Sequence, residues 1–252
     1  AKLAIQMSNR NFGAGSDGLI LILKSKKADF RMRMFNADGS ESGMCGNGIR
    51  CFARYVYDHK LTTKENLEIE TGSGVRQLKL KTKKGQVDSV TVDMGEPQLL
   101  RGLIPMLGEP GTVINENLHL PDGINFSITS LSMGNPHVII YVEDVEKFPV
   151  AKYGPDIENF NLFPERTNVE FVQIVNRKEV IQRTWERGSG ETMACGTGAS
   201  AVTVAGVLTG QTDRKLTVRL KGGTLKTEWD EKTNRVNLTG PAVEVYRGEW
   251  LL

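Results

Sequence analysis

The sequence has few of the residues that build metal sites, disulfide frameworks and cofactor sites. Its 252 residues include three cysteines, Cys45, Cys51 and Cys195, and three histidines. Three widely spread cysteines are too few for a secreted disulfide framework, and no CxxC or Cys/His cluster predicts a metal site. We therefore expect a reducing compartment, the cytoplasm. No pyridoxal or metal motif is visible, so we expect no cofactor.

The chain also lacks an excess of one charge and any long apolar run. Its 32 Lys and Arg oppose 30 Asp and Glu, and the basic residues are scattered, which argues against a nucleic-acid partner. Apolar runs such as residues 19–23 are too short to cross a bilayer. With 39% hydrophobic and 25% charged residues, the composition is that of a soluble globular protein with no membrane partner.

Glycine is frequent, and short alternating runs bounded by Gly, Asp, Asn or Pro predict a chain dominated by strands. Two segments differ. Apolar residues after Gly48 recur at helical spacing, which predicts an amphipathic helix ending near His59. The segment from Gly198 to Gly210 is small and apolar on every side, which is typical of a buried helix, although periodicity alone leaves a strand open. The predicted strands cover residues 30–35, 67–71, 75–82, 89–94, 127–131, 137–142, 168–175, 180–185, 216–220, 224–229 and 235–238.

The most informative feature is an internal repeat. ESGMCGNG at positions 41–48 returns as ETMACGTG at 191–198, so Cys45 and Cys195 stand 150 positions apart. Each copy follows a strand-like run and a Gly/Ser turn, and each precedes a helical segment and two short strands. Two copies of one unit are therefore predicted. Duplicated proteins tend to place equivalent loops across a cleft, and we expect the active site in a cleft between the halves.

Both repeat cysteines stand at the start of a predicted helix and are followed by glycines. The helix N-terminus favours anions, so we expect a lowered thiol pKa there and a carboxylate bound by the amides around Gly46-Asn47 and Gly196-Thr197. A thiolate on one face of a carbon and a thiol on the other would invert that carbon by proton transfer. The pattern favours cofactor-independent racemisation or epimerisation.

Other interpretations of the cysteines compete with this one. Buried inert thiols or a disulfide would be the default for two cysteines, but their place in the same Gly-rich repeat favours chemistry. Cys51 has no counterpart, because position 201 is Ala, and we expect it to pack in the helix body. A phosphate site is weakly supported, because CGNG and CGTG match neither common phosphate-loop pattern.

Four long segments together resemble diaminopimelate epimerases of bacterial or plant type. They are FNADGSESGMCGNGIRCFARYV, MGNPHVIIYVEDVEKFP, RTNVEFVQIV and ERGSGETMACGTGASA, and the match runs through nearly the whole chain. The resemblance implies reversible, cofactor-independent conversion of LL- to meso-2,6-diaminopimelate in lysine and cell-wall precursor synthesis. It also implies a homodimer.

The implied fold is α+β, with two pseudo-symmetric halves, each a barrel-like, antiparallel-rich sheet around a central helix. We place the halves at residues 1–110 and 111–252, with residues 241–252 as candidates for packing on the first half. Family members begin with a further strand and a substrate-contacting Asn, roughly two dozen residues that have no counterpart before NFGAGSDG. The first half is therefore expected to lack its first strand.

The resemblance also assigns roles to individual residues. It makes Cys45 and Cys195 the acid/base pair, with His137 of GNPH and Glu186 of ERG supporting proton transfer. Polar groups suited to the two amino-acid ends of the substrate complete the predicted site: Asn36, Gly46, Asn47, Asn135, Asn168, Glu186, Arg187, Gly196 and Thr197.

Three other functions compete with this one. A proline or hydroxyproline racemase would also use two cysteines, but the array of polar groups suits a long diamino diacid better. A binding protein that keeps the cleft without the chemistry would not need both cysteines. A cysteine hydrolase with His137 as base would leave the second thiol idle.

Overall fold

The structure, a computed structural model, describes residues 1–251 and divides the chain into two compact units. Unit 1 comprises Ala1–Asp93 and the described residues from Thr239 onward, and unit 2 comprises Met94–Leu238. The expected boundary at residue 110 therefore lies inside unit 2. The physical reason is that Ile104 and Met106 pack into the core of that unit.

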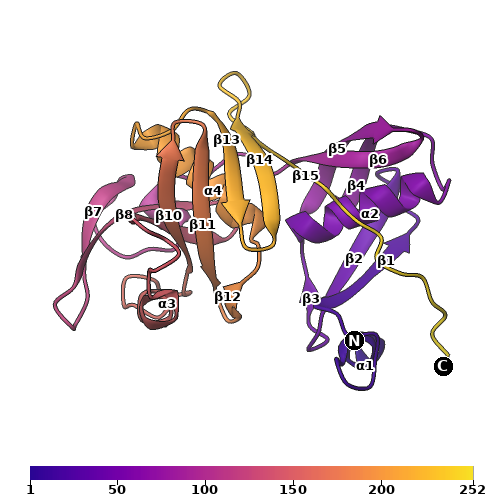
Figure 1. Ribbon diagram of the computed structural model, residues 1–252, viewed down its shortest axis with the longest axis horizontal. Helices are drawn as coiled ribbons and strands as arrows, with labels where there is room; N and C mark the ends of the chain where they lie inside the picture. Colours follow the sequence, from indigo (N-terminus) through magenta and orange to yellow (C-terminus); the bar gives the residue numbers. More distant parts are fainter. Residues whose placement is uncertain (252) are drawn as a thin grey trace. The chain divides into compact units, whose positions relative to one another are not determined.

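Unit 1 is a five-stranded sheet with one long helix (Figure 1). The strand order is β1-β2-β4-β5-β6, the short β3 pairs with β2, and the helix α2 contacts β1, β5 and β6. The helix has a buried face of Ile49, Phe52, Ala53 and Val56. The elements are α1 (Lys2–Ser8), β1 (Gly18–Leu23), β2 (Phe30–Asn36), β3 (Glu41–Ser42), α2 (Gly46–Asp58), β4 (Asn66–Thr71), β5 (Gly74–Lys83) and β6 (Gln86–Asp93).

Unit 2 repeats this plan and adds strands to it. Its strand order is β15-β14-β13-β11-β10-β9-β8-β7, with β12 paired to β11. The elements are η1 (Arg101–Leu103), β7 (Val113–His119), β8 (Asn125–Ser132), β9 (Pro136–Tyr141), α3 (Val150–Glu158), β10 (Asn168–Asn176), β11 (Glu179–Glu186), β12 (Gly190–Thr192), α4 (Gly196–Leu208), β13 (Lys215–Leu220), β14 (Gly223–Trp229) and β15 (Val236–Gly240).

The two units share pairing as well as order. In unit 1, β2 pairs in parallel with β4 so that Phe30 faces Ile69, and in unit 2, β11 pairs in parallel with β13 so that Val180 faces Val218. In unit 1 the chain runs from β2 through its short partner β3 into α2 and then into β4, which lies parallel to β2. In unit 2 it runs in the same way from β11 through β12 into α4 and then into β13. The internal repeat of the sequence is therefore a repeat of topology.

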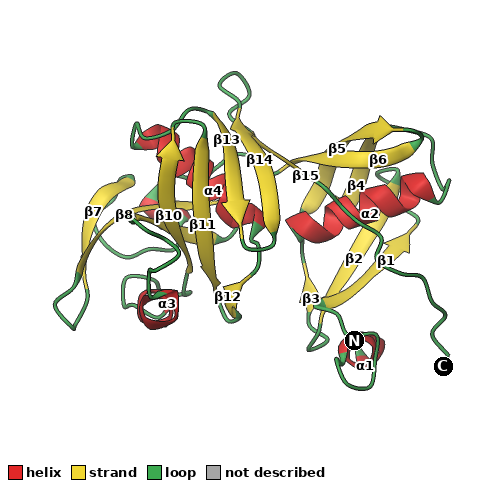
Figure 2. Cartoon of the chain, in the orientation of Figure 1, coloured by secondary structure: helices red, strands yellow, loops and turns green. Residues whose placement is uncertain are grey.

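The two long helices differ in how they are covered (Figure 2). Helix α4 contacts β8, β9 and β10 as well as β13 and β14, and its residues 198–206 are all buried. Only small side chains fit there: an added Cβ on Gly206 would lie 2.1 Å from Thr212 Oγ1. Helix α2 is covered on one face, and its side chains Arg50 and Arg54 donate hydrogen bonds to the backbone carbonyls of Pro241 and Ala242 in the segment that crosses it. Both predicted helices are confirmed.

The α+β class, with one helix packed on the sheet of each half, is confirmed. Each predicted strand overlaps an observed strand, but the prediction omits the strands β1 and β7, the helices α1 and α3, and the short elements β3, η1 and β12. Strand β1 is a continuous apolar run without alternation, and α3 contains Gly154 and Pro155, which are poor helix formers. Gly154 packs against the ring of Trp185, and a Cβ at this position would lie only 2.5 Å from the ring.

Candidate functional site

Each repeat cysteine is the N-cap of the long helix of its unit. Cys45 precedes α2 and Cys195 precedes α4, both in extended backbone conformation. The Cys45 sulfur accepts a hydrogen bond from the N–H of Gly48 at 3.3 Å, and the Cys195 sulfur accepts one from Gly198 at 3.4 Å. Each sulfur thus lies at the positive end of a helix. Gly46 and Gly196 occupy the first helical position, where backbone N–H groups point out of the helix end.

A bidentate ion pair holds the turn before each cysteine. Arg33 of β2 binds Glu41 of β3 at 2.9 and 2.8 Å, and 150 positions later Arg183 of β11 binds Glu191 of β12 at 2.7 and 3.0 Å. Arg183 also donates to three backbone carbonyls, those of residues 145, 146 and 148. The sequence analysis paired the glutamates but missed their arginine partners.

In unit 2, five side chains form a continuous hydrogen-bonded chain. The Cys195 sulfur lies 3.4 Å from Thr197 Oγ1, which accepts a hydrogen bond from Asn135 Nδ2 at 3.3 Å. Asn135 Oδ1 lies 3.0 Å from His137 Nε2, and His137 Nδ1 lies 2.6 Å from Glu170 Oε1. The structure thus brings four predicted site residues together and adds Glu170, which the sequence analysis missed.

Glu186 completes the surroundings of Cys195. It is the last residue of β11, as Asn36 is of β2, and its carboxylate accepts a hydrogen bond from Thr192 at 2.5 Å. Burial, and then the neighbouring Glu170, raise the pKa of Glu186 although hydrogen bonds to Thr192 and Cys195 oppose the shift. A carboxyl group held in this way can carry a proton closer to neutral pH than an exposed one.

The expectation that the helix N-terminus lowers the thiol pKa is wrong for Cys195. Burial, and then the carboxylates of Glu170 and Glu186, raise the pKa of this thiol well above its ordinary value. The hydrogen bonds from Thr197 and Gly198 act in the opposite direction but are outweighed. Desolvation in unit 2 therefore dominates over the helix end, and Cys195 is held as a thiol at neutral pH.

Two further predicted residues build the loop after β11. Asn168 of β10 is buried, accepts a hydrogen bond from the N–H of Arg187 at 3.0 Å and donates one to the carbonyl of Pro136 at 2.7 Å. The Arg187 guanidinium donates to the carbonyl of Glu165 at 2.9 Å. In the structure these residues fix the start of the loop that follows Glu186. Their roles toward a substrate stay predictions.

In unit 1, the predicted residues lie at the end of β2 and the start of α2. Asn36 Nδ2 donates to Ser40 Oγ at 3.0 Å within the turn that follows β2. Asn47 is half-buried in the first turn of α2, and the buried Arg50 donates to the carbonyl of Gly46 at 2.9 Å. Unit 1 thus presents a cysteine, an amide side chain and a helix end.

The prediction that Cys51 packs in the helix body is wrong, because its side chain is exposed. The buried stripe of α2 passes through Ile49, Phe52, Ala53 and Val56, and position 51 lies off it.

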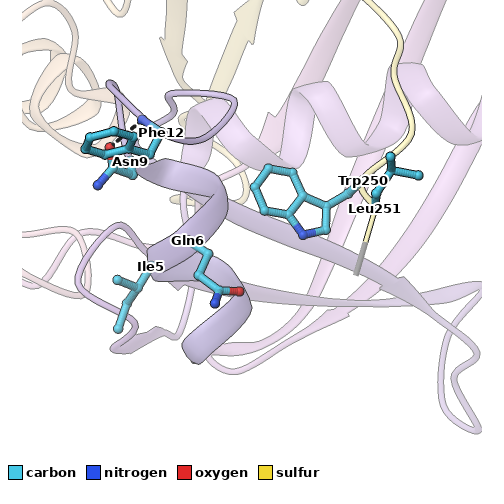
Figure 3. A pocket seen from close by; sticks show the side chains of 6 residues that line it. All are labelled: Ile5, Gln6, Asn9, Phe12, Trp250 and Leu251. Atoms are coloured by element: carbon cyan, nitrogen blue, oxygen red, sulfur yellow. Dashed lines mark hydrogen bonds between the residues drawn. The ribbon is translucent and has the colours of Figure 1, made fainter.

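A cavity of about 630 Å³ lies in unit 1, lined by residues of α1, the turn after it and the C-terminal segment (Figure 3). It contains none of the predicted site residues. Within residues 1–251, no three His, Cys, Asp or Glu side chains come close enough to hold a metal ion. No helix in that part of the chain is long and apolar enough to cross a membrane.

Comparison with known proteins identifies the family. A sequence model of the diaminopimelate epimerase family matches residues 1–100 and 129–245. The chain belongs to this family. The matched residues include the helix starts at Cys45 and Cys195 and the chain of side chains between Thr197 and Glu170.

Relatives named diaminopimelate epimerase match almost the full chain. The protein from Heliobacterium modesticaldum is 53% identical over 98% of this chain and 88% of its own length, and that from Moorella thermoacetica is 53% identical over 99% and 89%. The Methanococcus maripaludis relative is 53% identical over 96% of this chain and 87% of its own.

Solved structures share the diaminopimelate epimerase-like fold at lower identity. A PhzF-family phenazine biosynthesis protein from Bacillus anthracis matches with a TM-score of 0.68 and 20% identity, covering 95% of this chain and 86% of its own. A hydroxyproline epimerase from Agrobacterium vitis matches with a TM-score of 0.69 and 14% identity, covering 94% and 76%. These likenesses bear on the fold alone.

Proposed function

We propose that this protein interconverts LL- and meso-2,6-diaminopimelate, with Cys45 and Cys195 as the two groups that exchange protons with the α carbon. The observation that carries the proposal is the equivalent placement of both sulfurs, each at the N-cap of the long helix of its unit. Membership of the diaminopimelate epimerase family supports the reaction and the substrate.

The proposed reaction needs one thiolate and one thiol. The thiolate removes the α proton, breaking the C–H bond and forming S–H, while the opposite thiol delivers its proton to the other face of the same carbon. At the end the two sulfurs have exchanged protonation states and the carbon is inverted. Because Cys195 is held as a thiol in the structure, we assign it the acid role in the first half of a cycle and Cys45 the base role.

Negative charge develops on the substrate carboxylate as the α proton leaves. The first-turn amides of α2 and α4, at Gly46-Asn47 and Gly196-Thr197, are proposed to receive it, because helix N-termini stabilise anions. Asn36, Asn168 and Arg187 are proposed to hold the polar groups at the substrate's ends, and His137 and Glu186 to support the proton transfer beside Cys195.

Turnover of LL-diaminopimelate in deuterated water tests the proposal. The reduced protein should produce the meso isomer with one α-deuterium, and Cys45→Ala or Cys195→Ala should each lower the rate at least about 100-fold, the range for losing a positioned acid or base. Cys51→Ala, which removes an exposed thiol of the same helix, should leave the rate unchanged.

Two results would refute it. Full turnover in either repeat-cysteine variant would remove the two-base mechanism, and deuterium incorporation into proline or hydroxyproline but not into diaminopimelate would assign a different substrate. We also propose a cytoplasmic homodimer that needs no cofactor. Light scattering coupled to size exclusion checks the dimer, and unchanged turnover after exhaustive dialysis against a chelator checks independence from metal.

A further inference from the structure

Unit 2 contains a buried carboxylate that the proposed mechanism leaves without a role. Glu170 is 0% exposed and lies on β10, two residues after Asn168, which pairs with His137 of β9. Its Oε2 accepts a hydrogen bond from Gln182 Nε2 at 3.0 Å, and its Oε1 lies 2.6 Å from His137 Nδ1. The carboxylate also lies against the first turn of α4, because an added Cβ on Gly198 would stand 2.6 Å from Oε1.

The partners of the His137 ring fix where its hydrogens are. The His137 and Glu170 side chains are both 0% exposed, and Glu170 Oε1 binds Nδ1. Because Asn135 donates through Nδ2 to Thr197 Oγ1, its Oδ1 is the atom that faces Nε2. An amide oxygen only accepts hydrogen bonds, so Nε2 carries a hydrogen.

A hydrogen on Nε2 sets the direction of the remaining hydrogen bonds. It requires an acceptor, and Asn135 Oδ1 stands 3.0 Å away. The Asn135 amide nitrogen then faces Thr197 Oγ1 and donates to it. The Thr197 hydroxyl thus accepts a hydrogen bond from Asn135, and its own hydrogen is left to point at the sulfur of Cys195, 3.4 Å away.

We infer that Glu170 is a positioning residue, which holds the His137 ring through Nδ1 with Nε2 donating to Asn135 and thereby aims the Thr197 hydroxyl at the sulfur of Cys195. The sulfur then has two donors, Thr197 and the N–H of Gly198, for the moment at which it becomes a thiolate. The inference rests on the proposed function, because the second donor affects turnover only if Cys195 exchanges protons with the substrate.

The ionisable groups around the sulfur come from three strands. Glu170 of β10 and Glu186 of β11 act on Cys195, and His137 of β9 acts on Glu186. The buried positions of β8, β13 and β14, which also pack on α4 and are fully described, carry no ionisable side chain. A substitution of Glu170 therefore has two effects on the Cys195 thiol. Removing the negative charge favours the thiolate, whereas disturbing the hydrogen-bonded side chains takes a donor from the thiolate and disfavours it.

Nitrogen NMR on the protein labelled with ¹⁵N-histidine tests the first link without a substrate. The three histidines give separable signals, and His137→Gln assigns the one of interest. We expect a hydrogen on Nε2 of His137, because the Asn135 oxygen that faces it can only accept. A wild-type spectrum in which Nδ1 is protonated and Nε2 is not would overturn the inference.

The reactivity of the Cys195 thiol tests the whole series of hydrogen bonds from Glu170 to the sulfur. In a Cys45→Ala/Cys51→Ala background Cys195 is the only thiol, so its rate of alkylation by iodoacetamide, followed by mass spectrometry, measures its thiolate fraction. Glu170→Gln replaces the carboxylate by an amide, which can donate or accept and so fixes neither tautomer of His137. Losing the Thr197 donor should slow alkylation about tenfold at each pH from 7 to 9.

The sign of the change decides the outcome. If Glu170 were only a nearby negative charge, its removal would speed alkylation, and that result, like an unchanged rate, would overturn the inference. Glu116→Gln removes a carboxylate that binds Arg101 elsewhere in unit 2 and should leave the rate as in wild type. Neither the NMR spectrum nor the alkylation rate depends on diaminopimelate. An enzyme that gives both expected results but does not turn over diaminopimelate would therefore refute the proposed function alone.

Discussion

Glu186 shows at the scale of one residue how the site costs stability. Its pKa is raised, first by burial, so the folded state favours the protonated form. For such a carboxyl group the stabilising contribution is present below the unfolded pKa and is lost as the pH rises through the folded pKa. At neutral pH the ionised group therefore opposes folding.

We expect Glu186→Gln to be more stable than wild type at pH 7.5, with an advantage that shrinks as the pH falls toward 4.5. The amide oxygen can still accept the hydrogen bond from Thr192. Urea unfolding at both pH values measures the difference. Glu191→Gln is the control and should be less stable than wild type at pH 7.5, because the pKa of Glu191 is lowered, first by its bond to Arg183. A Glu186 variant less stable than wild type at pH 7.5 would contradict this account.

The two arginines of the repeat make the same ion pair in different surroundings. The side chain of Arg183 is 11% exposed and that of Arg33 is 37% exposed, and exposed pairs contribute little. We expect Arg183→Ala to lower the free energy of unfolding by about 3 kcal/mol, because three carbonyls and a half-buried Glu191 lose their donor. Arg33→Ala, measured beside it by urea unfolding, should change little. Equal losses would show that burial is not the cause.

At the scale of elements, the sequence predicted what local pattern determines. The repeat around Cys45 and Cys195 gave both helix starts, because an N-cap, following glycines and apolar spacing act within a few residues of one another. The strand alternation located most of the sheet for the same reason. These features need no knowledge of distant contacts.

Features that depend on distant contacts escaped prediction. Glu170 joins His137 only because β9 and β10 pair in parallel, and the two residues are 33 positions apart. Its one local signal is an acidic residue inside the apolar run VEFVQIV. Helix α3 forms around Gly154 and Pro155 because the Trp185 ring packs there, which outweighs weak helix propensity.

The equivalent glycines at the starts of α2 and α4 allow a paired test of this element. An added Cβ at Gly198 would stand 2.6 Å from Glu170 Oε1, which His137 and Gln182 hold in place. At Gly48 the nearest atom, at 2.8 Å, is the end of the flexible Ile20 side chain. We expect Gly198→Ala to lower the free energy of unfolding by about 2 kcal/mol and Gly48→Ala to lower it by less than about 1 kcal/mol, as measured by thermal or urea unfolding. The reverse order would mean that the carboxylate is free to move.

At the scale of the whole molecule, each of the two units contains part of the predicted site. Unit 2 holds Cys195, its carboxylates and the chain to Glu170 in one continuous stretch, whereas unit 1 holds Cys45 and is assembled from both ends of the chain. Unit 2 has its own core, which includes Phe171, Ile140 and Val169. A continuous stretch with a complete core is able to fold alone.

We therefore expect residues 94–238 expressed alone to fold, with one cooperative unfolding transition and a protonated Nε2 on His137. Under the proposed mechanism the fragment should not epimerise diaminopimelate, because it lacks Cys45, the proposed second proton-exchanging group. Circular dichroism, ¹⁵N-histidine NMR and the deuterium assay measure the three properties. Measurable inversion by the folded fragment would show that one cysteine suffices, whereas a folded and inactive fragment is the result that a shared, two-cysteine reaction requires.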